Sequence, residues 1–367
     1  MNNMLGIINL DGEQDLFQEL TYFRCGASLP YAGKYRLIDF VMSNMVHAGI
    51  TDIAVFVRKK YRSLMDHLGN GREWDLDRKK GGVFILPPDW NDPTDHSKGD
   101  LQHFHNNMDF FLRGRADYVL FADSQQICHI DFRAVLDSHI ASGADVTVVC
   151  KRMEPAEEHR TCYRLTVDDH GNVLGLSMDE SNPNIFMNMY VLRKDPMLEL
   201  VRHCIAHGAD NFLRDGIIGQ LPSLKVKAWA FDGLLQTINS VESYYKHSIS
   251  LLRPEIHREL FLAGNPIYTK IKDTAPTKYL DRATVDNSLI ANGCVIAGHV
   301  ESSILFRGVR VEEGATVKNS IIMQRSTLRP GAYLENVILD KEVTVTDHQR
   351  LIGSPNRPYA IPKRRTI

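Results

Sequence analysis

The C-terminal third of the chain carries a six-residue repeat, and this repeat constrains the fold more than any other feature of the sequence. Between residues 288 and 339, aliphatic residues recur six positions apart and glycines fall between many of them. The aliphatic positions are Ile290 and Ile296, Val311 and Val317, and Ile322, Leu328 and Leu334. This period is typical of a β-helix, in which each hexapeptide forms one side of a triangular coil. We therefore predict a left-handed β-helix over residues 265–367. An antiparallel sheet of short strands is the alternative.

The preceding part of the chain alternates short aliphatic runs with amphipathic stretches. The Val- and Ile-rich runs are residues 5–10, 51–57, 116–124 and 144–150. Runs of this kind separated by helical periodicity predict an α/β fold with a mostly parallel, Rossmann-like sheet over residues 1–239. Residues 240–264 are predicted to form a connecting helix and linker, with Ser240 as its N-cap. Ligands of such sheets bind beyond the carboxyl ends of the strands.

Composition excludes several classes of protein. The 367 residues are 43% hydrophobic and 24% charged with a formal net charge of -2, which is unlike a disordered chain or a basic nucleic-acid binder. No apolar run approaches the ~20 residues of a membrane helix, and the N-terminus does not resemble a secretory signal. The six cysteines are scattered without a CxxC pair, so neither a disulfide framework nor a thiolate zinc site is expected. We expect a cytoplasmic protein without membrane or nucleic-acid partners.

Three long motifs carry a resemblance to a known family. They are "YAGKYRLIDFVMSN" (31–44), "GREWDLDRKKGGVFILPP" (71–88) and "HIDFRAVLDSHIASGADVTVVC" (129–150). Together with the β-helix they closely resemble bacterial glucose-1-phosphate adenylyltransferase, also called ADP-glucose pyrophosphorylase. The resemblance implies a nucleotidyltransferase-like domain of the glycosyltransferase-A type. It also implies a reaction that joins ATP and glucose 1-phosphate with the help of Mg²⁺.

The phosphate-binding loop of the family falls on residues 11–17, where this chain departs from the pattern. Gly12 matches a family glycine, but Asp11 stands for the first glycine, Gln14 for a later one and Leu16 for the phosphate-binding arginine. The segment is acidic, and a carboxylate about 4 Å from a phosphate charge costs about 4 kcal/mol at an effective dielectric near 20. We therefore expect this loop to repel a triphosphate.

The family's metal carboxylates are also replaced. Gln125 stands at the position of the first metal-binding aspartate and Thr237 at that of the second. Asp123 lies two residues before Gln125, but two residues along a strand correspond to ~6.5 Å, which the strict geometry of Mg²⁺ would not tolerate. No cofactor is therefore expected.

The positions that hold the sugar and its phosphate depart in the same direction. Met178 replaces a glutamate, Asp179 replaces a phosphate-binding lysine, and Gly26 replaces a lysine that follows Arg24. Other positions still match and form a possible remnant ligand pocket: Gly12, Arg24, Gly33, Lys34, Gly99 and Asp215. We expect Arg24, which has lost its neighbouring lysine, to be a surface or structural residue.

These losses fall on the elements that bind charge, whereas the motifs that specify the fold are intact. The resemblance therefore implies a non-catalytic regulatory subunit of the D type in glycogen biosynthesis. Its expected partner is the catalytic adenylyltransferase subunit in a hetero-oligomer, expected to be a tetramer, and a homodimer alone is a further possibility. Two alternatives remain: an active adenylyltransferase with a rearranged site that uses Asp123, and a hexapeptide acyltransferase that uses His299.

Two further features have a structural and a functional interpretation. The pairs His103–His105 and His203–His207 lack a third metal ligand, so we interpret them as structural or solvated. The cationic C-terminal segment 363–365 could hold an anionic effector, or it could be a solvated tail.

Overall fold

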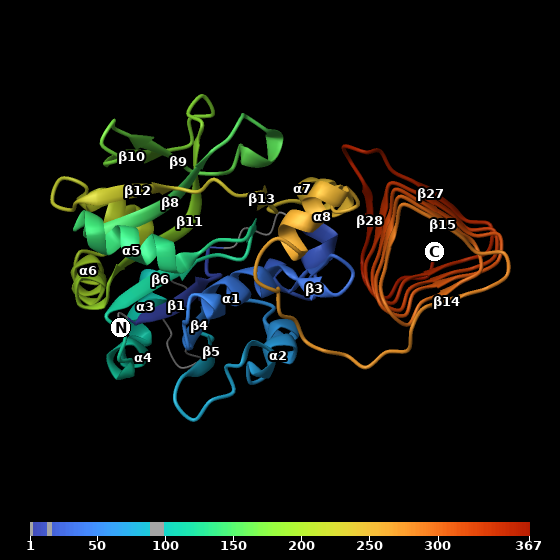
Figure 1. The fold of residues 1–367 in the computed structure, drawn as a ribbon, viewed down its shortest axis with the longest axis horizontal. Coiled ribbons are helices and arrows are strands. Elements are labelled where there is room, and N and C mark those ends of the chain that lie inside the picture. Colours follow the sequence, from blue (N-terminus) through green and yellow to red (C-terminus); the bar gives the residue numbers. More distant parts are fainter. Residues whose placement is uncertain (1–2, 13–16, 89–98) are drawn as a thin grey trace. The chain divides into compact units, whose positions relative to one another are not determined.

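The structure is a computed structural model that describes residues 3–12, 17–88 and 99–367. The chain divides into two compact units, whose elements are labelled in Figure 1. The first unit comprises residues 1–13, 40–61 and 68–235, and the second comprises residues 14–39, 62–67 and 236–367. Each unit has its own buried apolar core, as expected of domains.

The first unit is built on a sheet to which the described residues contribute nine strands. They are β1 (Met4–Asn9), β4 (Asp52–Phe56), β5 (Gly82–Leu86), β6 (Tyr118–Ala122), β8 (Val146–Arg152), β9 (Arg164–Val167), β10 (Val173–Ser177), β11 (Asn184–Arg193) and β12 (Val226–Ala230). The order is β10-β9-β11-β6-β1-β4-β5, and β8 pairs with β11 and β12.

The sheet is mixed, which differs from the mostly parallel sheet expected from the sequence. β1 is parallel to β4 and β6, but β11 is antiparallel to β6, β8 and β9. The connection 168–172 between β9 and β10 explains one antiparallel pair of this sheet. It is too short for the crossover of a dozen or more residues that parallel strands require.

Helices α5 (Phe132–Ser142) and α6 (Lys194–Ala206) cover opposite faces of this sheet. On α5, His139 hydrogen-bonds Thr147 Oγ1 of β8 through Nδ1 at 2.8 Å. Val146 and Val148, the neighbours of Thr147 on β8, pack instead in the core that contains Val201 of α6. Since successive side chains of a strand point to opposite faces, the two helices lie on different sides of the sheet.

Other short elements complete the two units. The remaining helices are α1 (Leu37–His47), α2 (Arg62–Leu68), α3 (Leu101–Asn106), α4 (Met108–Arg113), α7 (Val241–Ser250) and α8 (Pro254–Phe261). The short strands outside the main sheets are β2 (Pro30–Tyr31), β3 (Tyr35–Arg36), β7 (Gln126–Ile127) and β13 (Gln236–Thr237). Ser240 caps α7 as predicted, because its side chain accepts a hydrogen bond from Ser243 N.

The C-terminal segment of the second unit is a left-handed β-helix made of three parallel sheets (Figure 1). The first sheet contains β14 (Lys278–Tyr279), β17 (Val295–Ile296), β20 (Arg310–Val311), β23 (Thr327–Leu328) and β26 (Thr344–Val345). The second contains β15 (Thr284–Asp286), β18 (His299–Glu301), β21 (Thr316–Lys318), β24 (Tyr333–Glu335) and β27 (Arg350–Ile352). The third contains β16 (Leu289–Ile290), β19 (Ile304–Leu305), β22 (Ile321–Ile322), β25 (Val337–Leu339) and β28 (Tyr359–Ile361).

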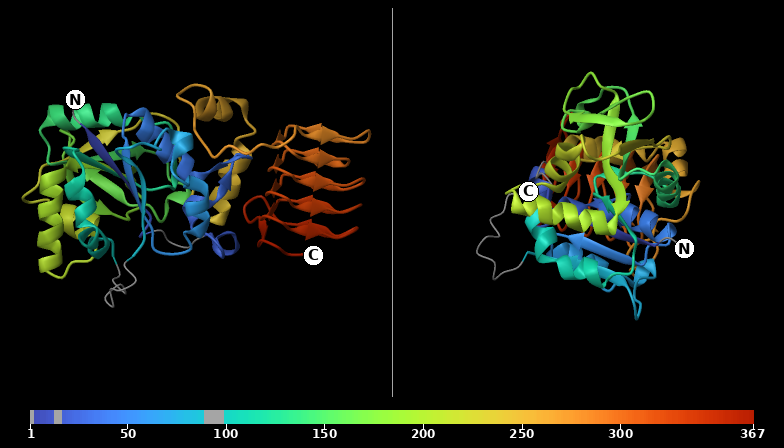
Figure 2. Two further views of the ribbon diagram at one scale, coloured as in Figure 1. Left: turned by 90° about the horizontal axis from the view of Figure 1, so that it is seen from below. Right: turned by 90° about the vertical axis from the view of Figure 1, so that its left-hand side faces the viewer.

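The six-residue repeat explains how the coils of the β-helix stack, as the side view in Figure 2 shows. Ile296 pairs with Val311, which pairs with Leu328, and all three side chains are buried in the interior. Each coil therefore places its aliphatic residues above those of the preceding coil. The β-helix predicted from the sequence is confirmed.

The second unit also contains N-terminal segments, so its boundaries differ from the predicted division after residues 239 and 264. The Tyr31 hydroxyl donates to Gln236 Oε1 at 2.7 Å, and the Tyr244 hydroxyl of α7 donates to the carbonyl of Pro30 at 2.6 Å. Arg24 forms a buried ion pair with Asp340 of the β-helix segment. These contacts join residues that are distant in sequence, which local patterns cannot reveal.

Two expectations about the whole chain can be compared with the structure. Within the described ranges, the helices are all too short or too polar to cross a membrane. The six cysteines are free and buried.

Candidate active site

The candidate site of the first unit lies at the carboxyl ends of parallel strands β1, β4 and β6. Asp11 follows β1 by two residues, Arg58 follows β4 by two, and Asp123 is the residue after β6. Because these strands are neighbours in the sheet, their carboxyl ends bring the three charged side chains to the same edge.

Asp11 is the centre of a buried ionic network. Arg58 Nη2 donates to Asp11 Oδ2 at 2.9 Å, and His103 Nδ1 lies 3.0 and 2.9 Å from the two carboxylate oxygens. The side chains of Asp11 and His103 are only 1% and 3% exposed. Arg58 also donates to the carbonyl of Gly99 at 2.9 Å. The charge of Asp11 is thus compensated within the chain.

This network concerns one acidic residue of the loop 11–17, and the expected repulsion of a triphosphate by the loop stays a prediction. The acidic loop was expected to act by repelling phosphate, yet the negative charge of Asp11 is engaged by Arg58. Gly12 beside it is exposed. Gln14 and Leu16 lie outside the described residues. No role was predicted for Arg58 from the sequence, although this residue directly follows the predicted strand 51–57, as Asp11 directly follows the predicted strand 5–10.

A second buried carboxylate, Asp100, extends the network towards residues 210–215. Asn9 Nδ2 donates to Asp100 Oδ2 at 2.7 Å and Phe212 N donates to Asp100 Oδ1 at 2.8 Å. Burial raises the pKa of Asp100 to about 6, and the nearby Asp11 charge adds to the increase. Asp100 therefore takes up a proton more readily than an ordinary aspartate.

The backbone at Gly99 packs closely against the backbone of Asp210. A Cβ atom at Gly99 would lie 1.7 Å from the carbonyl oxygen of Asp210, and Leu101 N donates to that same oxygen at 3.2 Å. Gly99 is thus required by backbone packing. Asp215 lies at the same place, where it accepts hydrogen bonds from the N–H groups of Asp210 and Asn211.

Asp215 is also bound by Arg214, whose Nε and Nη2 lie 2.7 and 2.9 Å from its two carboxylate oxygens. This pairing lowers the pKa of Asp215 to about 2. Both Gly99 and Asp215 therefore have structural roles in this chain. Whether either contacts a ligand stays a prediction.

The residues at the metal positions do not provide a magnesium site. Asp123 accepts hydrogen bonds from Asn188 Nδ2 at 2.8 Å and from Gln125 N at 3.0 Å, and burial raises its pKa to about 6. Gln125 offers a neutral amide, and Thr237, which is buried in the second unit, offers a hydroxyl. In the described part of the chain, no cluster of three or more His, Cys, Asp or Glu side chains could hold a metal. Since Mg²⁺ requires carboxylates, these residues do not fit the ion.

The two positions assigned to the sugar phosphate lie in an exposed turn after β10. The Met178 side chain is 50% exposed. Asp179 accepts hydrogen bonds from Ser181 N and Ser181 Oγ, which lower its pKa. The turn is stabilised locally, and its carboxylate replaces the cation that a phosphate would need.

The other matching positions belong to the second unit, where they have structural contacts. Arg24 is buried rather than at the surface and pairs with Asp340. Gly33 has a φ of +77°, and a Cβ there would lie 2.6 Å from Leu289 Cδ2, so both conformation and packing require glycine. Lys34 is exposed and lies 4.9 Å above the Tyr35 ring, and Gly26 is buried in a short 3₁₀ turn.

The second unit also contains a cluster of cations that sequence reasoning did not find. Burial and the neighbouring Arg24, Arg36 and Lys363 lower the pKa of Lys341 to about 6. Burial, Arg307 and Arg36 likewise lower the pKa of Lys272. Burial is the largest cause of both shifts and the neighbouring cations add to it, whereas Asp340 acts in the opposite sense on Lys341. We call Arg36, Lys272, Arg307, Lys341 and Lys363 the cation cluster.

Two residues of the C-terminal segment 363–365 interact with the rest of the second unit. Lys363 adds to the positive field at Lys341. Arg364 is bound by Glu342, with its Nε 2.7 Å from Oε2. The segment is therefore not simply a solvated tail.

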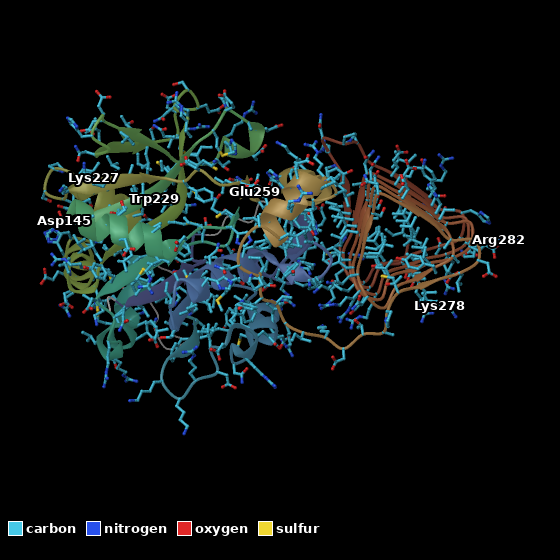
Figure 3. The ribbon with its side chains drawn as sticks, in the orientation of Figure 1. Asp145, Lys227, Trp229, Glu259, Lys278 and Arg282 are labelled. Atoms are coloured by element: carbon cyan, nitrogen blue, oxygen red, sulfur yellow. The ribbon has the colours of Figure 1, made fainter. Side chains whose placement is uncertain are left out.

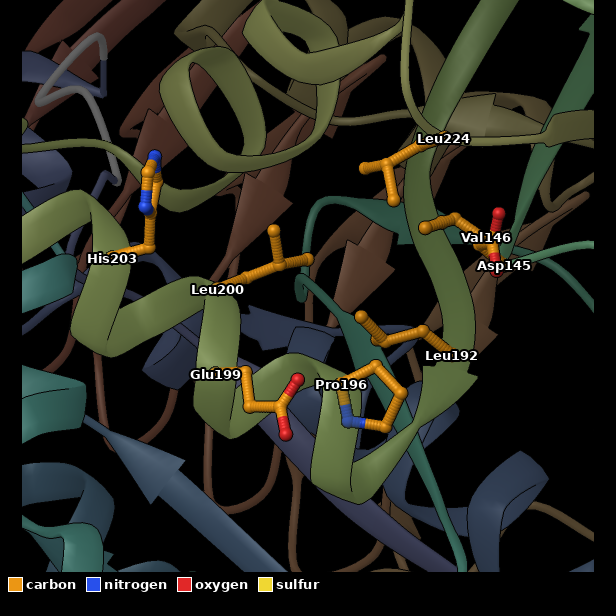
Figure 4. Close-up of a pocket in the computed structure, with 8 residues that line it drawn as sticks. All are labelled: Asp145, Val146, Leu192, Pro196, Glu199, Leu200, His203 and Leu224. Atoms are coloured by element: carbon orange, nitrogen blue, oxygen red, sulfur yellow. The ribbon is translucent and has the colours of Figure 1, made fainter.

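A pocket of about 230 Å³ lies elsewhere in the first unit, between α6 and the start of β8 (Figure 4). Its lining residues are Asp145, Val146, Leu192, Pro196, Glu199, Leu200, His203 and Leu224. Asp145 lies in the same part of this unit as Lys227 and Trp229 of β12 (Figure 3). None of the predicted site residues lines this pocket.

The raised pKa of Asp100 leads to an expected pH dependence. Its pKa of about 6 lies above the ordinary value of 3.8, so the folded chain binds the proton first as the pH falls. The free energy of unfolding should therefore rise between pH 6 and pH 4, by up to roughly 2 kcal/mol from this group. Urea unfolding followed by tryptophan fluorescence at several pH values should show a flatter profile for Asp100→Asn, but an unchanged one for the exposed Asp109→Asn. An identical profile in Asp100→Asn and the parent chain would contradict the assignment.

The chain is similar to known proteins over nearly its whole length. The profile of the family described as "Nucleotidyl transferase" matches residues 12–175, and that described as "GlmU-like, C-terminal hexapeptide" matches residues 274–357. The chain is 36% identical over 364 residues to "Glycogen biosynthesis protein GlgD" of Bacillus subtilis (strain 168), covering 99% of this chain and 96% of the relative.

Two further relatives are similar over most of their length. The protein named "Glycogen biosynthesis protein GlgD" of Geobacillus stearothermophilus is 39% identical, over 86% of this chain and 83% of the relative. A "Glucose-1-phosphate adenylyltransferase" of Fervidobacterium nodosum is 30% identical, over 95% of this chain and 85% of the relative. The similarity thus extends across both units.

Proposed function

Since the chain belongs to the bacterial glucose-1-phosphate adenylyltransferase family, with relatives named GlgD among its members, we propose that it is a non-catalytic regulatory subunit. It acts in glycogen biosynthesis, in relation to ADP-glucose synthesis. In this proposal it assembles with the catalytic adenylyltransferase subunit in the cytoplasm, in a hetero-oligomer such as a tetramer, and changes the activity of that subunit.

The observation that carries this proposal is the charge balance of the candidate active site. Attack of a sugar phosphate on ATP gathers several negative oxygens, which cations and a metal must neutralise. Here the cation Arg58 is engaged by Asp11, and the metal positions hold Gln125 and Thr237. A chain with this site has few means of stabilising the transition state, so its role must be exerted through another subunit.

The cation cluster supports regulation by an anion. Burial, and next the charges of neighbouring cations such as Arg36 and Lys363, lower the pKa of Lys341, so the charged form of this lysine is disfavoured where it lies. A polyanionic effector would stabilise the charged form and favour the conformation that binds it. The second unit is thus suited to receive an effector without carrying out chemistry.

The first coil of the β-helix supports assembly. β14, β15 and β16 pair with the next coil on one side, and the described residues provide no strand on the other. The side chains of Tyr279 and Leu280 are 53% and 40% exposed there. An open edge with exposed apolar residues is a surface that a partner subunit can cover.

The decisive experiment mixes the purified chain with the catalytic adenylyltransferase of the same organism. We expect no pyrophosphate release by this chain alone. Co-migration in size-exclusion chromatography is expected, as is a change of about fivefold or more in the rate or in the effector concentration for half-activation. Lys341→Met should reduce the effector response but leave co-migration intact, and Lys227→Met on β12 is the matched control. A mixture with the rate and effector response of the catalytic subunit alone would refute the proposal.

The alternative function is an active adenylyltransferase with a rearranged site. The position of Asp123 at the carboxyl end of β6 favours it, because this carboxylate lies next to Gln125. The hydrogen bonds from Asn188 and Gln125 and the raised pKa argue against metal binding there. Magnesium-dependent pyrophosphate release by the isolated chain, abolished in Asp123→Asn, would establish this alternative.

A further inference from the structure

We propose that the Asp11 carboxylate is the resident anion of an oxyanion site that Arg58 and His103 form in the first unit. The inference deepens the proposed function, because it states which group fills the degenerate active site. It rests on the proposed function only in taking this place for the former active site. The site accepts a small carboxylate or a similar oxyanion. In this chain, the side chain of Asp11 is the carboxylate that occupies it.

The geometry of the contacts is that of a bound anion. Both oxygens of Asp11 have donors: Arg58 Nη2 at 2.9 Å from Oδ2, and His103 Nδ1 at 2.9 and 3.0 Å from Oδ2 and Oδ1. The carboxylate is 1% exposed and His103 is 3% exposed, so water is largely excluded. A short, charge-assisted contact in a buried site is the usual way in which proteins hold an oxyanion.

The donors are fixed by parts of the fold that do not depend on Asp11. Arg58 also donates to the carbonyl of Gly99. The His103 ring packs edge-on against Phe56 of β4, with centroids 4.8 Å apart. His103 Nε2 is buried and has no hydrogen-bond partner among the described residues, so Nδ1 carries the proton that is donated to Asp11. Removing the carboxylate should therefore leave its donors in place.

In the native chain, the Asp11 carboxylate also changes the charge that the site can offer to a phosphate. Among the described residues, the Asp11 carboxylate pairs with the Arg58 guanidinium, and Asp100 is a second carboxyl group close by. In this described part of the site, the positive charge of Arg58 is therefore already engaged when a phosphate arrives. The site is closed because its own anion occupies it, in addition to lacking the residues that the family uses.

The test is chemical rescue of stability in the isolated full-length chain. Asp11→Ala removes the charge and makes room for formate, whereas Asp11→Asn removes the charge but keeps the volume. We expect both variants to melt at a lower temperature than the parent chain. Sodium formate at about 50 mM, compared with sodium chloride at equal ionic strength, should restore about half of the lost Tm in Asp11→Ala only, because a ligand of the folded state raises Tm.

Three results bear on the inference. Equal Tm values of Asp11→Ala in formate and chloride would overturn it. Rescue that persists in the double variant Asp11→Ala/Arg58→Met would also overturn it, since the anion would then bind elsewhere. If Asp11→Ala is recovered unfolded, refolding yields in the two salts replace Tm, and equal yields have the same meaning. Because no partner subunit is present, failure here is distinct from failure of the proposed assembly.

Discussion

Replacing Arg24 with leucine should lower the free energy of unfolding by about 3 to 5 kcal/mol. The Arg24 and Asp340 side chains are only 4% and 1% exposed, and they form an ion pair inside the second unit. The leucine variant leaves the Asp340 carboxylate buried without its cation, and this desolvated charge is the cause of the expected loss. Thermal unfolding followed by far-ultraviolet circular dichroism measures the effect.

The double variant Arg24→Leu/Asp340→Leu separates this cause from a loss of packing. Because it removes both charges, it should recover much of the stability that the single variant loses. Arg113→Leu is the matched control, since its ion pair with Asp109 is 83% and 81% exposed and should contribute less than ~1 kcal/mol. A single variant as stable as this control would show that Arg24 does not compensate Asp340.

The second large effect is expected from Arg58→Met in the first unit. This change leaves the buried Asp11 carboxylate with His103 alone, and the free energy of unfolding should fall by about 3 to 5 kcal/mol. Tryptophan fluorescence is a suitable measurement, because Trp74 and Trp229 lie in the first unit and the segments of the second contain no tryptophan.

Asp11→Asn/Arg58→Met provides the comparison for this result. Without the carboxylate, the absence of Arg58 should matter less, although its hydrogen bond to the Gly99 carbonyl is still lost. The coupling free energy from the four variants should be well above the 0.5 kcal/mol that separates independent from interacting sites. A coupling near zero would mean that Arg58 and Asp11 do not stabilise one another in solution.

Local patterns account for what the sequence predicted correctly. The β-helix follows from the six-residue spacing of pairs such as Ile322 and Leu328, which the structure places on two different sheets of the β-helix. The cap at Ser240 was predicted from the position of this serine at the start of a predicted helix. The mixed sheet was missed because strand direction depends on the length of connections such as 168–172, which a pattern of aliphatic runs does not resolve.

The candidate site was predicted only in part, for a related reason. The replaced positions, among them Gln125, Thr237 and Asp179, can be read directly from the residues, because folding does not give a side chain a cationic or metal-binding group that its residue type lacks. The compensation of Asp11 could not be read in this way. Its partners are 47 and 92 residues away in the sequence.

The sequence by itself determined the two architectures and the loss of the family's charged groups. The architectures follow from the period of the aliphatic residues along the chain. The loss of charged groups follows from the type of side chain at each position. Only the tertiary structure decided which charges meet: Asp11 with Arg58, Arg24 with Asp340, and the members of the cation cluster with one another. The physical reason is that an ionic contact acts over a few ångströms, and the order of strands and coils determines which distant residues come within that range.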